Sequence, residues 1–148
     1  MLFDPTRHEA LQAIPWDEDR VRAFIAHIAA DAEARFTPQA WWPSHPRDVD
    51  PGEDAQAPPT PLYYGACGVA WALHYLQDVG AVRLQRSYRD APLMADLLAR
   101  NSAWLGGEAT AEAASFMMGE LPIQMLAFGG APTPATLHGV RQVIFFTQ

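Results

Sequence analysis

Apolar residues recur with a helical period in the stretch 15–36. Four of them stand at i, i+3, i+4 and i+7 and so share one helix face: Val21, Phe24, Ile25 and Ile28. Asp17 precedes this group as a candidate N-cap, and the acidic residues that follow it suit the positive end of the helix dipole. The pattern predicts a first helix that begins after Asp17 and ends near Phe36.

The periodicity breaks over the range 37–61. This range holds seven prolines, and because proline fixes φ and lacks a backbone N–H, it predicts a long surface loop. Trp41 and Trp42 are the exception within it. Two adjacent indole rings carry a large apolar area, so we expect them to anchor the loop to the body of the protein.

Three further apolar segments each end at glycine, which favours helix termination. They run from Gly65 or Ala66 to Gly80, from Ala91 to about Leu105, and from Ser115 to Phe128 before Gly129-Gly130. Pro122 suits the first turn of the last of these. A fifth helix opens at Thr133 or Pro134, whereas Val143 to Phe146 is more typical of a strand or a frayed end. The fold class is predicted to be all-α.

Two segments with glycine at the start of an apolar helix form a quasi-repeat. They are "YYGACGVAWALHYL" and "SFMMGELPIQMLAF", a little over fifty residues apart, with a more polar helix between them. This alternation predicts inner and outer helices stacked as hairpins, as in a helical solenoid or toroid. At 148 residues the chain is expected to form one domain, 1–148.

Charge and composition narrow the classes of partner. The net charge is −7 with only ten Lys and Arg residues, so nucleic acid is not expected as a partner. One cysteine cannot form an internal disulfide. No apolar run reaches the ~18 residues of a membrane span, and the N-terminus does not resemble a signal peptide. We therefore expect a cytoplasmic protein.

The two glycine-bearing segments resemble those of lanthionine synthetase C-like (LanC-like) proteins. "LYYGACGVAWALHYL" is similar to the first aromatic-x-Gly-x-x-Gly opening of that family, and "SFMMGELPIQML" to the next. "LFDPTRHEAL" and "WWPSHPRD" resemble its N-terminal lead-in. The residues that carry the resemblance are Tyr64, Gly65, Gly68, Gly119 and Glu120. The second motif departs from the family pattern, because Pro122 stands where a second glycine is usual.

The resemblance implies a double-layered α/α toroid, or six-hairpin-type barrel, of which this chain would be the N-terminal portion. Active members hold zinc through two cysteines and a histidine, and the metal activates a peptide thiol for addition to a dehydroamino acid. This chain has one cysteine and no Cys-His pair. We therefore expect a truncated LanC-like protein without a zinc cofactor or metal site, and without catalysis by itself. The five motif residues then have a structural role.

Cys67 is the first candidate for chemistry outside the resemblance. A position near a helix start favours a thiolate, whereas two flanking glycines favour a small packing residue. Cys67 and His74 lie two helical turns apart, about 10 Å along the axis, which does not favour a shared metal ion. His74 and Asp78, at i and i+4, are predicted to form a helix-surface pair.

Three glutamates suggest, as a weaker alternative, a carbohydrate-active enzyme of the six-hairpin type. Glu108 and Glu112 would lie one helical turn apart, a spacing compatible with a glycosidase pair, and Glu120 suits a helix N-terminus. His138 is interpreted as a surface or packing residue.

Aromatic residues suggest an interaction surface as a further hypothesis. Those considered as the lining of a peptide groove, or else as core and loop anchors, are Trp41, Trp42, Tyr63, Tyr64 and Trp71. A helical module of this kind would bind a peptide, a protein partner or a second copy of itself.

Overall fold

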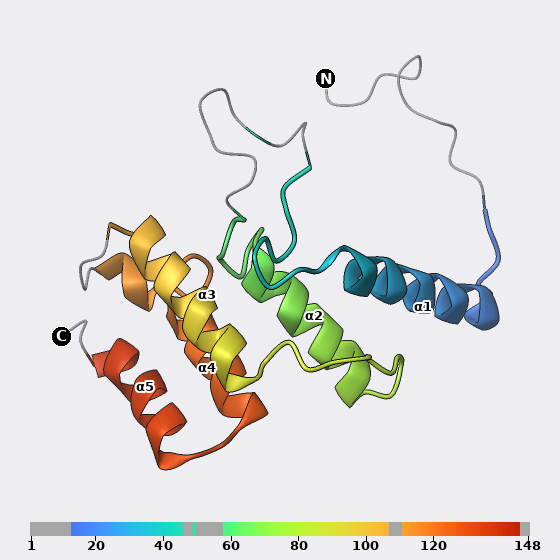
Figure 1. Ribbon diagram of the computed structural model, residues 1–148. Helices are drawn as coiled ribbons and strands as arrows, with labels where there is room; N and C mark the ends of the chain where they lie inside the picture. The colour runs from blue at the N-terminus through green and yellow to red at the C-terminus, as the bar shows by residue number, and fades with distance from the viewer. Residues whose placement is uncertain (1–12, 46–48, 50–57, 107–110, 146–148) are drawn as a thin grey trace.

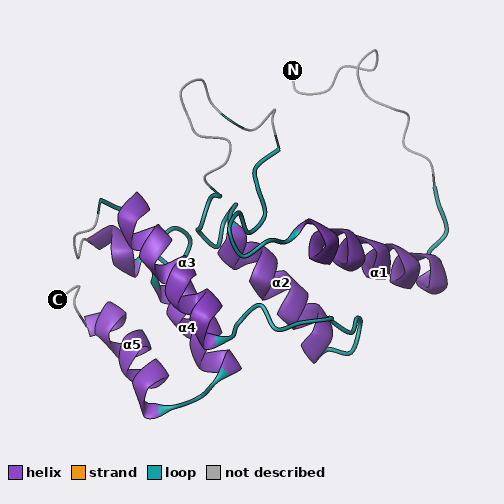
Figure 2. Cartoon of the chain, in the orientation of Figure 1, coloured by secondary structure: helices purple, strands orange, loops and turns teal. Residues whose placement is uncertain are grey.

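The computed structural model describes residues 13–45, 49, 58–106 and 111–145 (Figures 1 and 2). Their regular structure consists of five α-helices and one 3-10 helix. They are α1 (Glu18–Arg35), α2 (Ala66–Asp78), α3 (Ala91–Trp104), η1 (Ala111–Ala114), α4 (Leu121–Gly130) and α5 (Pro134–Phe145). Within these ranges there is no strand, and an isolated bridge joins Thr37 to Trp41. The all-α prediction is confirmed.

Helix α4 lies at the centre of the arrangement and contacts α2, α3 and α5. The indole N–H of Trp71 on α2 donates to the carbonyl oxygen of Pro122 at the start of α4, at 3.2 Å. In Figure 1, α2 and α4 run in one direction and α3 and α5 in the other. The predicted hairpin stack and toroid go further than these contacts and stay predictions.

Helix α1 lies at the edge of the molecule, on the side of α2 away from α5 (Figure 1). Its predicted cap is confirmed, because the Asp17 carboxylate accepts from the Arg20 N–H at 3.0 Å. The apolar face that the periodicity defines is buried only in part, because Val21 and Ile25 are half-buried and the other two residues are exposed. Phe24 and Ile28 are 54% and 64% exposed, and the helix instead packs through small Ala29.

The expected ends of α2 and α3 are also present. Gly80 has φ +74, its N–H donates to Gln77, and the next N–H, of Ala81, donates to Leu76. This pair of bonds is a Schellman motif, which requires the left-handed conformation that glycine adopts without strain. Asp90 caps α3 by accepting from the Leu93 N–H at 3.1 Å.

One predicted segment is helical only in part, and one predicted end was wrong. Helix α4 begins at Leu121 with Pro122 in its first turn, as expected, whereas 115–118 of the same apolar segment form a turn in which the Ser115 hydroxyl accepts from the Met118 N–H. Helix α5 continues to Phe145, so the strand interpretation of its end fails for Val143 to Phe145, while Phe146 lies outside the described residues. Packing of α5 along α4 outweighs the weak strand preference of these residues.

Trp41 and Trp42 anchor the proline-rich loop, as predicted. The Trp41 ring is fully buried, and its indole N–H donates to Asp96 of α3 at 2.8 Å. The Trp42 indole donates to the Ala32 carbonyl of α1 at 2.7 Å. Both indole rings lie against Phe36, and the Trp42 ring also lies against Tyr88, with ring centroids 5.0–5.6 Å apart. This aromatic cluster joins α1, α3 and the loop.

Candidate functional site

The two glycine-bearing openings lie side by side. The Tyr63 N–H, before α2, donates to the Met117 carbonyl oxygen, before α4, at 3.1 Å. Segments more than fifty residues apart in the sequence thus form one surface at the start of both helices. We therefore take this junction of the two openings as the candidate binding site of the described chain.

Main-chain atoms fill the space at the start of α2. The carbonyl oxygens of Pro59 and Thr60 accept from the N–H groups of Ala66 and Cys67, at 2.8 and 3.1 Å. A Cβ on Gly65 would lie 2.6 Å from the Pro59 oxygen, and one on Gly68 would collide with the Leu62 oxygen. Both glycines therefore serve close packing, and the helix start has no free N–H group at these positions for an anion.

The second opening is organised differently. Gly119 is buried, and its N–H donates to the Ser115 carbonyl at 2.9 Å. Glu120 is the N-cap residue of α4, as its expected place at a helix N-terminus implied, but its carboxylate makes no capping hydrogen bond. Glu120 is half-buried.

Exposed apolar side chains cover the junction of the two openings. We call this group the opening surface; it consists of Tyr63, Tyr64, Phe116 and Met117. The two tyrosines are 70% and 53% exposed, and their rings meet edge to face with centroids 6.0 Å apart. Clustered exposed apolar side chains mark interaction sites more often than single ones do. Of the aromatic residues considered in the sequence, the tyrosine pair alone is exposed, whereas Trp71 is half-buried.

Cys67 has the environment of a packing residue. Its side chain is fully buried, and burial raises the pKa of the thiol to about 12. A thiol that stays protonated at neutral pH is a poor nucleophile and a poor metal ligand. The interpretation as a reactive centre is therefore not supported.

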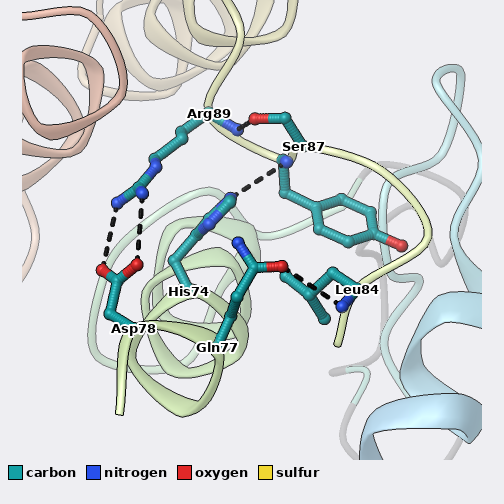
Figure 3. A network of polar contacts seen from close by, with 7 residues as sticks. His74, Gln77, Asp78, Leu84, Ser87 and Arg89 are labelled. Atoms are coloured by element: carbon teal, nitrogen blue, oxygen red, sulfur yellow. Dashed lines mark hydrogen bonds and ion pairs between the residues drawn. The ribbon is translucent and has the colours of Figure 1, made fainter. Parts of the chain in front are cut away.

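The predicted surface pair of His74 with Asp78 was wrong. His74 is buried, and its Nε2 accepts from the Tyr88 N–H at 3.0 Å, while Asp78 pairs instead with Arg89 at 3.3 Å (Figure 3). Because Nε2 accepts, the neutral ring carries its proton on Nδ1, which has no partner within the described part of the chain. Burial, and secondarily the Arg89 charge, lowers the pKa of His74, with a smaller opposing effect of Asp78.

The segment 81–90 is held from two sides. On the α2 side, Gln77 accepts from the Leu84 N–H at 3.2 Å, beside the His74 contact (Figure 3). On the α1 side, Glu33 accepts from the Gln85 N–H at 2.8 Å and from the Tyr88 hydroxyl at 3.1 Å. These polar groups therefore fix the connection between α2 and α3.

The remaining candidates do not converge. Glu108 lies outside the described residues, as does the side chain of Glu112, and His138 is exposed on α5. Among the residues that the structure describes, no three His, Cys, Asp or Glu side chains are grouped as metal ligands would be. The glycosidase pair therefore stays an untested prediction.

Sequence reasoning missed a buried polar contact. Asn101 of α3 is fully buried and accepts from the Thr60 hydroxyl at 2.7 Å, which ties the segment before α2 to α3. The two residues are 41 positions apart, and no local pattern joins them.

A hollow of about 300 Å³ lies beside α1. It is lined by Trp16, Val21, Ile25 and Ala81 together with the Glu18–Arg22 ion pair.

Comparison with known proteins returns no match to any family model, curated protein or solved structure. In the described part of the chain, no helix is both long and apolar enough to cross a membrane.

Proposed function

We propose that this chain is a LanC-like helical module that binds a peptide substrate of zinc-dependent thioether formation and does not catalyse that reaction by itself. The opening surface supports this proposal. There, the two segments that resemble LanC-like openings are joined by the Tyr63 to Met117 hydrogen bond. Its exposed tyrosine rings offer a peptide apolar contacts at low cost in side-chain entropy, and the flexible Met117 thioether adapts to the shape of the partner.

The donor set of this chain does not fit the zinc ion of complete family members. That site takes two thiolates, and the chain has a single cysteine, whose thiol is buried. The Nε2 of His74 already accepts a main-chain N–H. We therefore assign no step of thioether formation to residues of this chain.

A protein-docking module is the second candidate function. Phe24 and Ile28 on α1 are large apolar side chains that are exposed in the chain alone, and a protein partner would cover them. The carbohydrate-active interpretation has no comparable support, since Glu120 is the one glutamate of the three whose side chain is described.

Binding of a model peptide tests the proposal. A fluorescent peptide that contains dehydroalanine and cysteine should bind the chain, and Tyr63→Ala/Tyr64→Ala should weaken its affinity about tenfold or more. Tyr75→Ala is the matched control, because Tyr75 on α2 is 64% exposed and does not belong to the opening surface. Equal affinities of the three proteins, or no binding at millimolar peptide, would refute the binding role.

The non-catalytic part of the proposal has a separate test. The chain is purified with zinc present, and bound metal is measured by elemental analysis while peptide thiol is followed with a colorimetric reagent. We expect less than stoichiometric zinc and the same rate of thiol loss as in the peptide without the chain. One zinc per chain, or thiol loss faster than in the peptide alone, would overturn this part.

A further inference from the structure

We propose that α1 joins two copies of this chain, by pairing antiparallel with α1 of a second copy about a two-fold axis near Ala26. The inference is independent of the peptide-binding proposal. It rests on the exposure of one stripe of α1 and on the order of the charges along it.

The stripe is exposed and apolar at its centre. Phe24 and Ile28 are more than half exposed, and the side of α1 that packs on the body is a different one, through Ala29 and Ala32. In Figure 1, α1 borders the molecule along its length. Because Phe24 and Ile28 are both more than half exposed, a second helix has access to this face.

Charged residues continue the stripe in both directions. At 100° per residue, six side chains fall within a sector of about 80°. In order along the helix they are Asp17, Arg20, Phe24, Ile28, Asp31 and Arg35. All six are exposed. Acid precedes base at each end of the stripe, and two apolar residues lie between the ends.

The sequence of charged and apolar residues along the stripe is complementary to the same stripe on a second copy that runs in the opposite direction. When a second copy lies antiparallel, Phe24 faces Ile28 of the other copy, Arg20 faces its Asp31, and Asp17 faces its Arg35. The midpoints of all three pairs fall at or next to residue 26, so one axis satisfies them together. A two-fold interface has this property, because residue i contacts residue j and residue j contacts residue i.

Orientation is specified by the same charges. In a parallel pair in register, Arg20 would face Arg20 and Asp31 would face Asp31, and like charges oppose association. The existing contacts on α1 prepare the antiparallel pair. Arg35 already contacts Asp31 at 2.9 Å, and the Arg20 guanidinium lies over the Phe24 ring, 5.6 Å from its centroid. A second copy extends these into a network of four charges on each side of the apolar centre.

A single helix pair is a small interface, so the association is a weak one that depends on concentration and salt. Sedimentation of the full chain from about 10 μM to 1 mM should show monomer and dimer in equilibrium. Phe24→Ser should raise Kd about tenfold or more. Tyr75→Ser, an exposed apolar residue on α2, should leave Kd unchanged.

Charge reversal tests the orientation. Arg20→Asp and Asp31→Arg each create two like-charge contacts in the dimer and should each raise Kd about tenfold. Each variant places its new charge at the end of the helix dipole that favours it, so α1 should stay helical by circular dichroism. In an equal mixture of the two variants both contacts are attractive again. The heterodimer should therefore form with nearly the wild-type Kd, as should the homodimer of the double variant R20D/D31R.

Three results would overturn the proposal. They are a monomer at 1 mM, a dimer that Phe24→Ser does not weaken, and a mixture of the two charge variants that associates no better than either alone.

Discussion

Replacing Gly68 by alanine tests the close approach of α2 to the segment before it. The added Cβ would fall on the carbonyl oxygen of Leu62, a main-chain atom that cannot rotate away as a side chain would. Overpacking of this kind costs about 1–3 kcal/mol. Alanine regains about 0.5–1 kcal/mol through its helix propensity. We therefore expect Gly68→Ala to lower the free energy of unfolding by about 1–2 kcal/mol.

Urea denaturation followed by far-UV circular dichroism measures this change. Gly129→Ala is the matched control, because its Cβ would meet only the Arg89 guanidinium, at an ordinary 3.8 Å. The control should gain up to about 1 kcal/mol from helix propensity. If Gly68→Ala is as stable as the wild type while Gly129→Ala behaves as expected, close packing does not explain Gly68.

Three other measurements address individual contacts. Because burial lowers the pKa of His74 below 6.5, the folded state binds fewer protons than the unfolded chain, so stability should be full above about pH 6.5 and be lost as pH falls below it. In the His74→Gln variant, the urea midpoint of unfolding should depend less on pH between pH 5 and 8 than in the wild type. The same pH dependence in both proteins would contradict this. Cys67 should react with a thiol reagent only at the rate of unfolding, since its pKa is about 12, and rapid labelling of native protein would show access. Trp41→Phe removes the bond to Asp96 and leaves part of a fully buried site empty, so it should cost about 2–4 kcal/mol, whereas Trp16→Phe, at an exposed site, should cost nothing measurable.

Local chemistry made most helix boundaries predictable. A carboxylate before the first turn predicted the start of α1, and Gly80 predicted the end of α2, because both signals act within a few residues. Pro122 correctly indicated the first turn of α4, whereas the apolar run from Ser115 does not reveal that a serine turn precedes the helix. The end of α5 depended on packing against α4 rather than on its own residues.

The candidate site was predictable in its parts and not in its assembly. The glycines of both openings were recognised from the sequence, but the contact of Tyr63 with Met117 joins segments that no local rule connects. The His74 and Asp78 pair failed for a related reason. Helical spacing made them neighbours, whereas the connection after α2 brings Tyr88 to one and Arg89 to the other.

Neighbouring residues were enough to predict the all-helical class, the Asp17 cap and the anchoring role of the two tryptophans, because periodicity and capping act within a few residues. Which apolar residues are buried depended instead on how the helices pack. Phe24 and Ile28 have the spacing of core residues, yet α1 packs through Ala29, since small side chains allow the aromatic cluster to approach and leave the larger ones facing outward. The exposed face of α1 on which the dimer proposal rests follows from that choice of packing side, which a helical period cannot specify.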